Sequence, residues 1–268
     1  MPIPLGSAAA ANREFPAFAL PTDWDVVVQD GGAILKAEVA LRIMRKRAGA
    51  RVFPEAVQID GRQHGVLVRT KTQEVLAQQA ILALGPWLGG ALPRIAPVLL
   101  VTRQAVGWFK AARPETVSPD RFPVFILERG PDDVIYGFPD FEQRGVKAAP
   151  HNHGPKVSAD DWDPPATDAE LLPVSAALAQ FVPGAAGPVF DRDICLYTNT
   201  LPADRRPDRG EEFIIDRWPN SHLIVASTCS GHGAKFATAI GDKLARLAID
   251  PTYEVEPFFK LSRYSAFC

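Results

Sequence analysis

Ser230-Gly231-His232-Gly233-Ala234-Lys235-Phe236 is the stretch of this sequence that decides its fold. It follows an apolar run at 222–226 that predicts a strand, and it leads into a predicted helix at 237–249. A strand, a turn of small residues and a helix form a typical anion site, because the first N–H groups of a helix lack partners within it. Gly231 and Gly233 would let the backbone approach such a ligand closely.

The segment before this turn begins with Cys195-Leu196-Tyr197-Thr198-Asn199-Thr200. A polar insert follows at 201–212, and then a predicted strand at 213–216. Far upstream, the apolar run at 80–84 ends at Gly85-Pro86-Trp87 and predicts a strand buried on both faces. The carboxyl ends of such strands are where an open α/β sheet binds its ligand. The sequence therefore predicts two glycine turns at a ligand-binding sheet edge.

The rest of the chain alternates between predicted strands and a few helices. Residues 1–13 read as a loose or partly helical lead-in. Gly49 ends a predicted amphipathic helix at 33–48. A second helix is predicted at 168–181. Further strands are predicted at 26–28, 56–59, 65–70, 75–84, 98–109, 122–128 and 134–139.

Three motifs, in this order, resemble one known family. Cys-x-Tyr-Thr at 195–198, Phe-Ile-Ile-Asp at 213–216 and Ser-Gly-His-Gly-x-Lys-Phe at 230–236 look like the C-terminal part of monomeric sarcosine oxidases and N-methyl-amino-acid oxidases. These are FAD-dependent amine oxidases of the D-amino-acid-oxidase superfamily. The resemblance covers roughly residues 15–250, and it is specific because several separate motifs match in order.

The resemblance implies a mixed α/β (α+β) fold of the D-amino-acid-oxidase type. It combines a partial FAD-binding layer with a β-rich, antiparallel substrate layer. The expected division is a partial FAD-binding segment at 1–97, a substrate domain at 98–190, and a return to the FAD-binding domain at 191–268.

The resemblance also implies FAD as the cofactor. Cys195 matches the cysteine that forms a thioether with the 8α-methyl group of the flavin, which requires a thiolate. The alternative for Cys195 is a buried structural cysteine. The remaining residues expected at the cofactor are Gly85, Trp87, Ser230, Gly231, His232, Gly233 and Lys235.

Five residues are implied at the substrate side. Lys147 matches the lysine that activates O2 near the flavin, where a positive charge would stabilise the superoxide that forms. Tyr136 and Tyr197 match active-site tyrosines, and Lys235 matches the cation that meets the substrate carboxylate. His151, four residues after Lys147, is also expected there. Ordinary alternatives remain: a solvated lysine for Lys147, a packed core tyrosine for Tyr197, and a structural histidine for His151.

One element of the family is missing from this sequence. The family begins with a strand, Gly-x-Gly-x-x-Gly and a helix, followed by an acidic residue for the ribose, and no Gly-x-Gly-x-x-Gly occurs in the 268 residues. We therefore expect an N-terminally truncated oxidase of a secondary or N-methyl amine, which uses O2 and yields an imine and H2O2. The alternative is a non-catalytic remnant or binding module that lacks the cofactor.

Composition sets the outer limits. A formal net charge of −2, with 22% charged residues, argues against a nucleic-acid-binding surface. No apolar run is long enough to span a membrane. The start of the chain lacks a signal-peptide pattern, and Cys195, Cys229 and Cys268 have no metal-ligand spacing. We expect a monomeric cytoplasmic protein with reduced thiols and no metal, which acts on a small amine.

Overall fold

The computed structural model describes residues 5–55, 57–62, 64–131, 133–152, 154–160, 164–201 and 211–267. Ala56, at the start of one predicted strand, and most of the polar insert at 201–212 lie outside these ranges. The chain divides into two compact units. Unit 1 comprises Met1–Ile34 and Arg103–Cys195, and unit 2 comprises Leu35–Thr102 and Leu196–Cys268.

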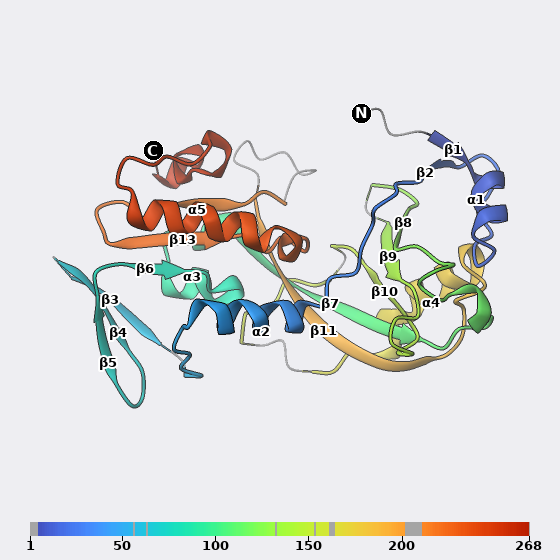
Figure 1. Ribbon diagram of the computed structural model, residues 1–268, viewed down its shortest axis with the longest axis horizontal. Helices are drawn as coiled ribbons and strands as arrows, with labels where there is room; N and C mark the ends of the chain where they lie inside the picture. The colour runs from blue at the N-terminus through green and yellow to red at the C-terminus, as the bar shows by residue number, and fades with distance from the viewer. Residues whose placement is uncertain are drawn as a thin grey trace. The chain divides into compact units, whose positions relative to one another are not determined.

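A five-stranded sheet forms the centre of unit 1, in the order β11-β7-β10-β9-β8 (Figure 1). The pairs β7–β10, β10–β9 and β9–β8 are antiparallel. Gly145 starts β10 with φ +74°, and a Cβ there would lie 2.6 Å from the carbonyl oxygen of Phe109, so this turn requires glycine. The strands are β7 (Leu99–Phe109), β8 (Phe125–Glu128), β9 (Val134–Phe138), β10 (Val146–Pro150) and β11 (Val189–Thr200).

Helix α4 (Asp168–Phe181) covers one face of this sheet. It begins with a capping box, in which Thr167 accepts a hydrogen bond from the Glu170 N–H and Glu170 accepts one from the Thr167 N–H. Alternate strand residues point into the core beneath α4, as the period of two requires. Unit 1 also contains β1 (Leu5–Ser7), α1 (Ala8–Glu14) and β2 (Asp25–Val27), and β1 pairs with β2.

Unit 2 is built on a three-stranded sheet in the order β12-β13-β6. Strand β13 (Leu223–Ser227) is buried throughout and pairs antiparallel with β12 (Ile214–Arg217) and parallel with β6 (Ala80–Leu82). Helix α5 (Ala237–Ile249) packs on β12 and β13 through its apolar side chains.

The described residues of unit 2 also include an antiparallel sheet, two further α-helices, several 3-10 turns, and the first residues of β7 and last residues of β11. The antiparallel sheet is β3 (Gln58–Arg62), β4 (Gly65–Arg69) and β5 (Glu74–Ala77), in that order. The helices are α2 (Ala37–Ala48) and α3 (Leu88–Ala91). None of the helices in the described ranges is long and apolar enough to cross a membrane.

Several sequence predictions are confirmed and three are corrected. Helices α4 and α5 begin and end where predicted, and Gly49 ends α2 in the left-handed conformation. The predicted strand 75–84 is wrong, because it is two strands, β5 and β6. Burial of β6 on both faces is also wrong: β6 is an edge strand of the described sheet and Ile81 is 43% exposed. Helix α2 starts four residues later than predicted, at Ala37.

Candidate functional site

The two predicted glycine turns lie together at one edge of the unit 2 sheet. Because β6 and β13 are parallel neighbours, their carboxyl ends meet at the same edge. The first turn, Gly85–Trp87, is a single 3-10 turn after β6, and Gly85 has φ +53°. A Cβ at Gly85 would lie 3.8 Å from Sγ of Cys229, which belongs to the second turn. This is the place where open α/β sheets bind ligands.

The turn after β13 is held by hydrogen bonds to its own backbone and to β11. Ser230 is fully buried, has φ +38°, and donates its N–H to the carbonyl of Thr198 at 3.1 Å. Its hydroxyl donates to the carbonyl of Glu212 at 3.3 Å. The Gly233 N–H donates to the Cys229 carbonyl at 2.9 Å. A buried serine with positive φ is uncommon and indicates a conformation that the surrounding structure enforces.

Tyr197 and Gly231 connect two of the three motifs on which the family resemblance rests. Tyr197 is only 4% exposed, and a Cβ at Gly231 would lie 2.3 Å from Cε2 of its ring. Gly231 also has φ +69°, which favours glycine. From the sequence, glycine at 231 is expected so that the backbone can approach a ligand closely. In the structure, glycine is also required for packing, because only glycine leaves room for the Tyr197 ring.

His232 and Lys235 occupy the outer side of the same turn. The His232 ring stacks on Phe213, with ring centroids 4.9 Å apart, and its Nδ1 lies 2.7 Å from the Ser230 carbonyl oxygen. These contacts fix the orientation of the ring. Lys235 is exposed, and its Nζ lies 5.4 Å from the centre of the Phe236 ring. An exposed ammonium at this position is accessible to an anionic group.

Lys147 lies in β10 of unit 1, between two aromatic rings. Its Nζ is 5.3 Å from the centre of the Trp108 ring and 5.5 Å from that of Phe138. Burial lowers the pKa of the Lys147 ammonium, and the negative charges of Cys195 and Asp193 oppose this shift. Lys147 is therefore not the solvated surface lysine that was its ordinary alternative.

Cys195 and Cys229 differ in their surroundings. Cys195 is exposed and interacts electrostatically with Lys147. Its exposure rules out the buried structural cysteine that was its ordinary alternative. Cys229 is partly buried, and burial raises the pKa of its thiol. The exposed Cys195 thiol is the more accessible of the two, and a nearby cation favours the thiolate form of a cysteine.

Tyr136 and His151 lie next to each other in unit 1. Tyr136 is in β9, and His151 follows β10 immediately. Their ring centroids are 6.4 Å apart in an edge-to-face arrangement, and Tyr136 makes a similar contact with Phe138 at 6.0 Å. The His151 N–H donates to the Val134 carbonyl at 2.8 Å, which continues the strand pairing.

Sequence reasoning missed Trp108 and Phe138. Each lies directly opposite Lys147 in a neighbouring strand. The predicted strands 98–109 and 134–139 contain these two aromatic residues. Their pairing with Lys147 depends on strand register, which the sequence alone does not give.

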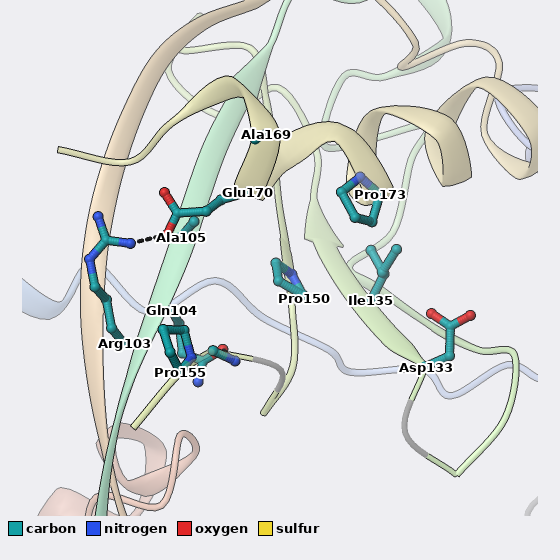
Figure 2. Close-up of a pocket in the computed structure, with 11 residues that line it drawn as sticks. Arg103, Gln104, Ala105, Asp133, Ile135, Pro150, Pro155, Ala169, Glu170 and Pro173 are labelled. Carbon is teal, nitrogen blue, oxygen red and sulfur yellow. Dashed lines mark hydrogen bonds and ion pairs between the residues drawn. The ribbon is translucent and has the colours of Figure 1, made fainter. Parts of the chain in front are cut away.

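A separate pocket in unit 1 has no residue in common with those predicted from the sequence. It has a volume of about 240 Å³ and lies where α4 meets β7, β9 and β10. Figure 2 shows Glu170 of α4 paired with the buried Arg103 of β7 at one end of it. Arg103 also donates to the Pro164 carbonyl at 2.5 Å. The pair neutralises the arginine and joins the start of α4 to the sheet.

The sheet edge in unit 2 fits part of a flavin nucleotide. The Ser227 hydroxyl, at the end of β13, is buried and has no hydrogen-bond partner within the described ranges. The Thr200 hydroxyl, at the end of β11, is in the same situation. Buried polar groups usually have partners, so these two hydroxyls are exceptions in the described part of the chain; the feature of this edge that suits a nucleotide is the pair of glycine turns. The pyrophosphate-binding Gly-x-Gly-x-x-Gly, however, is not in the sequence.

Comparisons with known proteins match almost the whole chain. A family model described as FAD dependent oxidoreductase (DAO) matches residues 5–247. Monomeric sarcosine oxidase from Bacillus sp. (strain B-0618) is 28% identical over 251 residues, which cover 89% of this chain and 61% of that protein. N-methyl-L-tryptophan oxidase from Salmonella heidelberg (strain SL476) is 31% identical over 271 residues, covering 96% of this chain and 68% of that protein.

Solved structures agree on the fold. NikD, described as an unusual amino acid oxidase essential for nikkomycin biosynthesis, superposes with a TM-score of 0.75 at 20% identity, covering 98% of this chain and 68% of that one. A mutant Amadoriase I from Aspergillus fumigatus gives 0.76 at 18% identity, covering 97% and 63%. The predicted mixed α/β flavoprotein fold is confirmed.

The chain spans 61% of the length of the sarcosine oxidases that it matches. The roles of individual site residues stay predictions. The family match extends over far more than half of the chain, and FAD is the cofactor that the family description names. The predicted resemblance is thus confirmed, and the chain belongs to the FAD dependent oxidoreductase family of the sarcosine oxidase and N-methyl amino acid oxidase type.

Proposed function

We propose that this chain is the larger part of an FAD-dependent oxidase. The enzyme would oxidise a secondary or N-methyl amine with O2, as a monomer, to give an imine and H2O2. The observation that carries the proposal is the edge formed by β6 and β13, where two glycine turns lie together beside the buried Ser227 hydroxyl. The similarity to amino acid oxidases over most of the chain supports it.

FAD, when bound, supplies the two-electron chemistry that no side chain can provide. In this proposal the turn 230–233 lies against the cofactor, with the N–H groups of Ser230, His232 and Gly233 already donating to the carbonyls of Thr198 and Cys229. Gly85 and Trp87 contact it from the neighbouring strand.

Lys147 would provide a fixed positive charge where O2 is reduced. Reduction of O2 concentrates negative charge on the oxygen atoms, and a preorganised cation in a site poor in water stabilises that charge. The aromatic neighbours of Lys147 and its partial burial suit this role. In our proposal Cys195, which interacts with Lys147, carries the flavin through a thioether.

The remaining predicted residues would bind the amine substrate. Lys235 presents an exposed ammonium, which suits a substrate carboxylate as a point charge. Tyr136 and His151 present adjacent rings, and Tyr197 presents a ring fixed against Gly231. Rings held this firmly can orient an amine without reorganising during the reaction.

A second candidate is a non-catalytic remnant or binding module of the same fold. Two observations favour it: the sequence lacks Gly-x-Gly-x-x-Gly, and Ile81 on the edge strand β6 is exposed. A sheet with an uncovered apolar edge is prone to association rather than catalysis. The colour of the fusion protein described in the next paragraph separates the two candidates: a yellow fusion with flavin absorbance supports the oxidase, and a colourless fusion supports the remnant.

The direct experiment supplies the motif that the sequence lacks. The chain is fused to the part of the Bacillus sarcosine oxidase that it does not match, and H2O2 release is measured with sarcosine and with N-methyl-L-tryptophan. Glycine and L-tryptophan, which lack the N-methyl group, serve as controls. The proposal predicts amine-dependent H2O2 from the fusion and its loss in Lys147→Met. A fusion that binds FAD but produces no H2O2 with any secondary amine would contradict it.

A further inference from the structure

Lys147 occupies the middle of a row of three side chains across the unit 1 sheet. In the register of the strands, it pairs with Trp108 of β7 on one side and with Phe138 of β9 on the other. Residues directly opposite each other in antiparallel strands project from the same face of the sheet and contact one another. The row is therefore set by backbone hydrogen bonding rather than by the chance orientation of one long side chain.

The row lies on the face opposite the helix. The neighbours of Lys147 in β10, Val146 and Ala148, are fully buried in the core that includes α4 residues. Since side chains alternate along a strand, Lys147 projects to the other side, where all three residues of the row are only partly buried. The ammonium is thus neither fully solvated nor enclosed.

Both rings are within the range of a cation–π interaction. The Nζ of Lys147 is 5.3 Å from the Trp108 centroid and 5.5 Å from the Phe138 centroid, and such contacts act within about 6 Å. Two rings on opposite sides restrict the four-carbon side chain far more than one ring could. Fixing a lysine side chain in a single position costs considerable conformational entropy.

The charged groups around Lys147 come from the turn before β10 and from β11. Arg144, in the turn before β10, lies over the same Trp108 ring at 4.9 Å and repels the ammonium. Asp193 and Cys195, in β11, attract it. The Arg144 guanidinium nitrogen Nη2 lies 3.5 Å from the carboxylate oxygen Oδ2 of Asp191. Two cations thus lie within cation–π range of the same Trp108 ring.

We infer that Trp108 and Phe138 are positioning residues, which hold the Lys147 ammonium in a fixed place on the open face of the sheet. This inference deepens the proposed function, because it explains how a flexible lysine could act as a preorganised charge. A lysine that is merely packed against apolar neighbours would keep several rotamers. A lysine held between two rings keeps one.

The experiment reads the position of the ammonium directly in the 268-residue chain, without FAD. Lysine amines are converted to ¹³C-dimethylamines, which stay cationic, and their methyl resonances are followed by NMR over a pH titration. Loss of one resonance in Lys147→Met assigns it. Aromatic rings shift nuclei above their faces upfield, so the Lys147 methyls should resonate upfield of those of Lys71, which is exposed.

Variants of the two rings then separate positioning from packing. Trp108→Leu keeps an apolar side chain but removes the ring, so the upfield shift should shrink. Trp108→Phe should restore most of it. Phe138→Leu should have the same effect as Trp108→Leu. The matched control is Phe259→Leu, whose ring lies 5.5 Å from Lys243 and should change the Lys243 resonance alone.

The NMR results that would overturn this inference differ from the H2O2 results that would overturn the proposed function. A Lys147 resonance without an upfield shift in the wild type, or one that Trp108→Leu and Phe138→Leu leave unchanged, would overturn the inference. Equal effects of Trp108→Leu and Trp108→Phe would also overturn it, since general packing would then suffice. None of these results bears on O2 reduction, which the H2O2 assay of the fusion tests separately.

Discussion

The ring of Tyr197 fills the space that a side chain at Gly231 would need. A Cβ at Gly231 would lie 2.3 Å from Cε2 of the ring, far inside van der Waals contact. Two motifs that are distant in the sequence are therefore interlocked: the end of β11 and the turn after β13. This contact fixes the turn 230–233 whether or not a cofactor is bound.

Gly231→Ala should destabilise the chain through this contact. The positive φ of Gly231 alone costs a non-glycine residue roughly 1–3 kcal/mol, and the clash with Tyr197 adds to it. Urea unfolding would measure the loss. Gly241→Ala is the matched control, because nothing lies within 4 Å of a Cβ at that helical position, and it should gain about 0.5–1 kcal/mol. A Gly231→Ala variant as stable as the wild type would show that the turn is not as described.

Lys147→Met should change how stability depends on pH. The pKa of Lys147 in the folded chain is lowered from its ordinary value of 10.5, mainly by burial. Between the folded and the unfolded pKa of Lys147, the unfolded chain binds more protons than the folded chain, so Lys147 makes the free energy of unfolding rise with pH. Below the folded pKa, Lys147 lowers the free energy of unfolding. Lys147→Met should therefore be more stable than the wild type at neutral pH, and the difference should shrink as pH rises towards 10.5.

Urea unfolding of Lys147→Met and the wild type at several pH values gives the difference between their free energies of unfolding. The contributions of the other titrating groups, which both proteins share, cancel in this difference. The control is Lys71→Met, which makes the same substitution at an exposed lysine. A stability difference between Lys147→Met and the wild type that is constant with pH would contradict the burial of the charge.

Local signals predicted much of this fold, and long-range pairing limited the rest. Helix α4 begins at Asp168, as its amphipathic pattern predicts, and the capping box of Thr167 and Glu170 is the physical reason for that start. The apolar run at 80–84 was mistaken for a strand buried on both faces, because hydrophobicity does not report whether a neighbouring strand is present. The contacts of Lys147 with Trp108 and Phe138 depend on strand register, and so could not be derived from the motifs.

Cys195 should carry the flavin in a version of the chain that holds FAD, such as the fusion described above. Its exposure and the nearby Lys147 favour the thiolate that attachment requires. After acid denaturation, flavin should stay on the wild-type polypeptide and be released from Cys195→Ala. Cys229→Ser is the control and should retain the flavin, because burial keeps the Cys229 thiol protonated. Complete release from the wild type would refute the thioether.

Lys147→Met should slow the reaction with O2 in the same FAD-containing version. Removal of one preorganised charge commonly costs about 10²–10³ in rate. Stopped-flow measurement should show this loss in flavin reoxidation, and a much smaller effect on flavin reduction by the amine. Lys243→Met offers a comparison, because Lys243 also lies near an aromatic ring but is paired with Glu256. Equal reoxidation rates in Lys147→Met and the wild type would exclude the proposed role.

Titration of the 268-residue chain with FAD, followed by flavin fluorescence and by amide NMR, tests the central claim most directly. The edge formed by β6 and β13 offers contacts to the cofactor, but the sequence lacks the glycine motif for its pyrophosphate. We predict binding that does not saturate at micromolar FAD, with amide shifts at Gly85 and at 230–233. Stoichiometric binding at micromolar FAD or below, or shifts that leave both turns unchanged at the highest FAD concentration, would contradict the account.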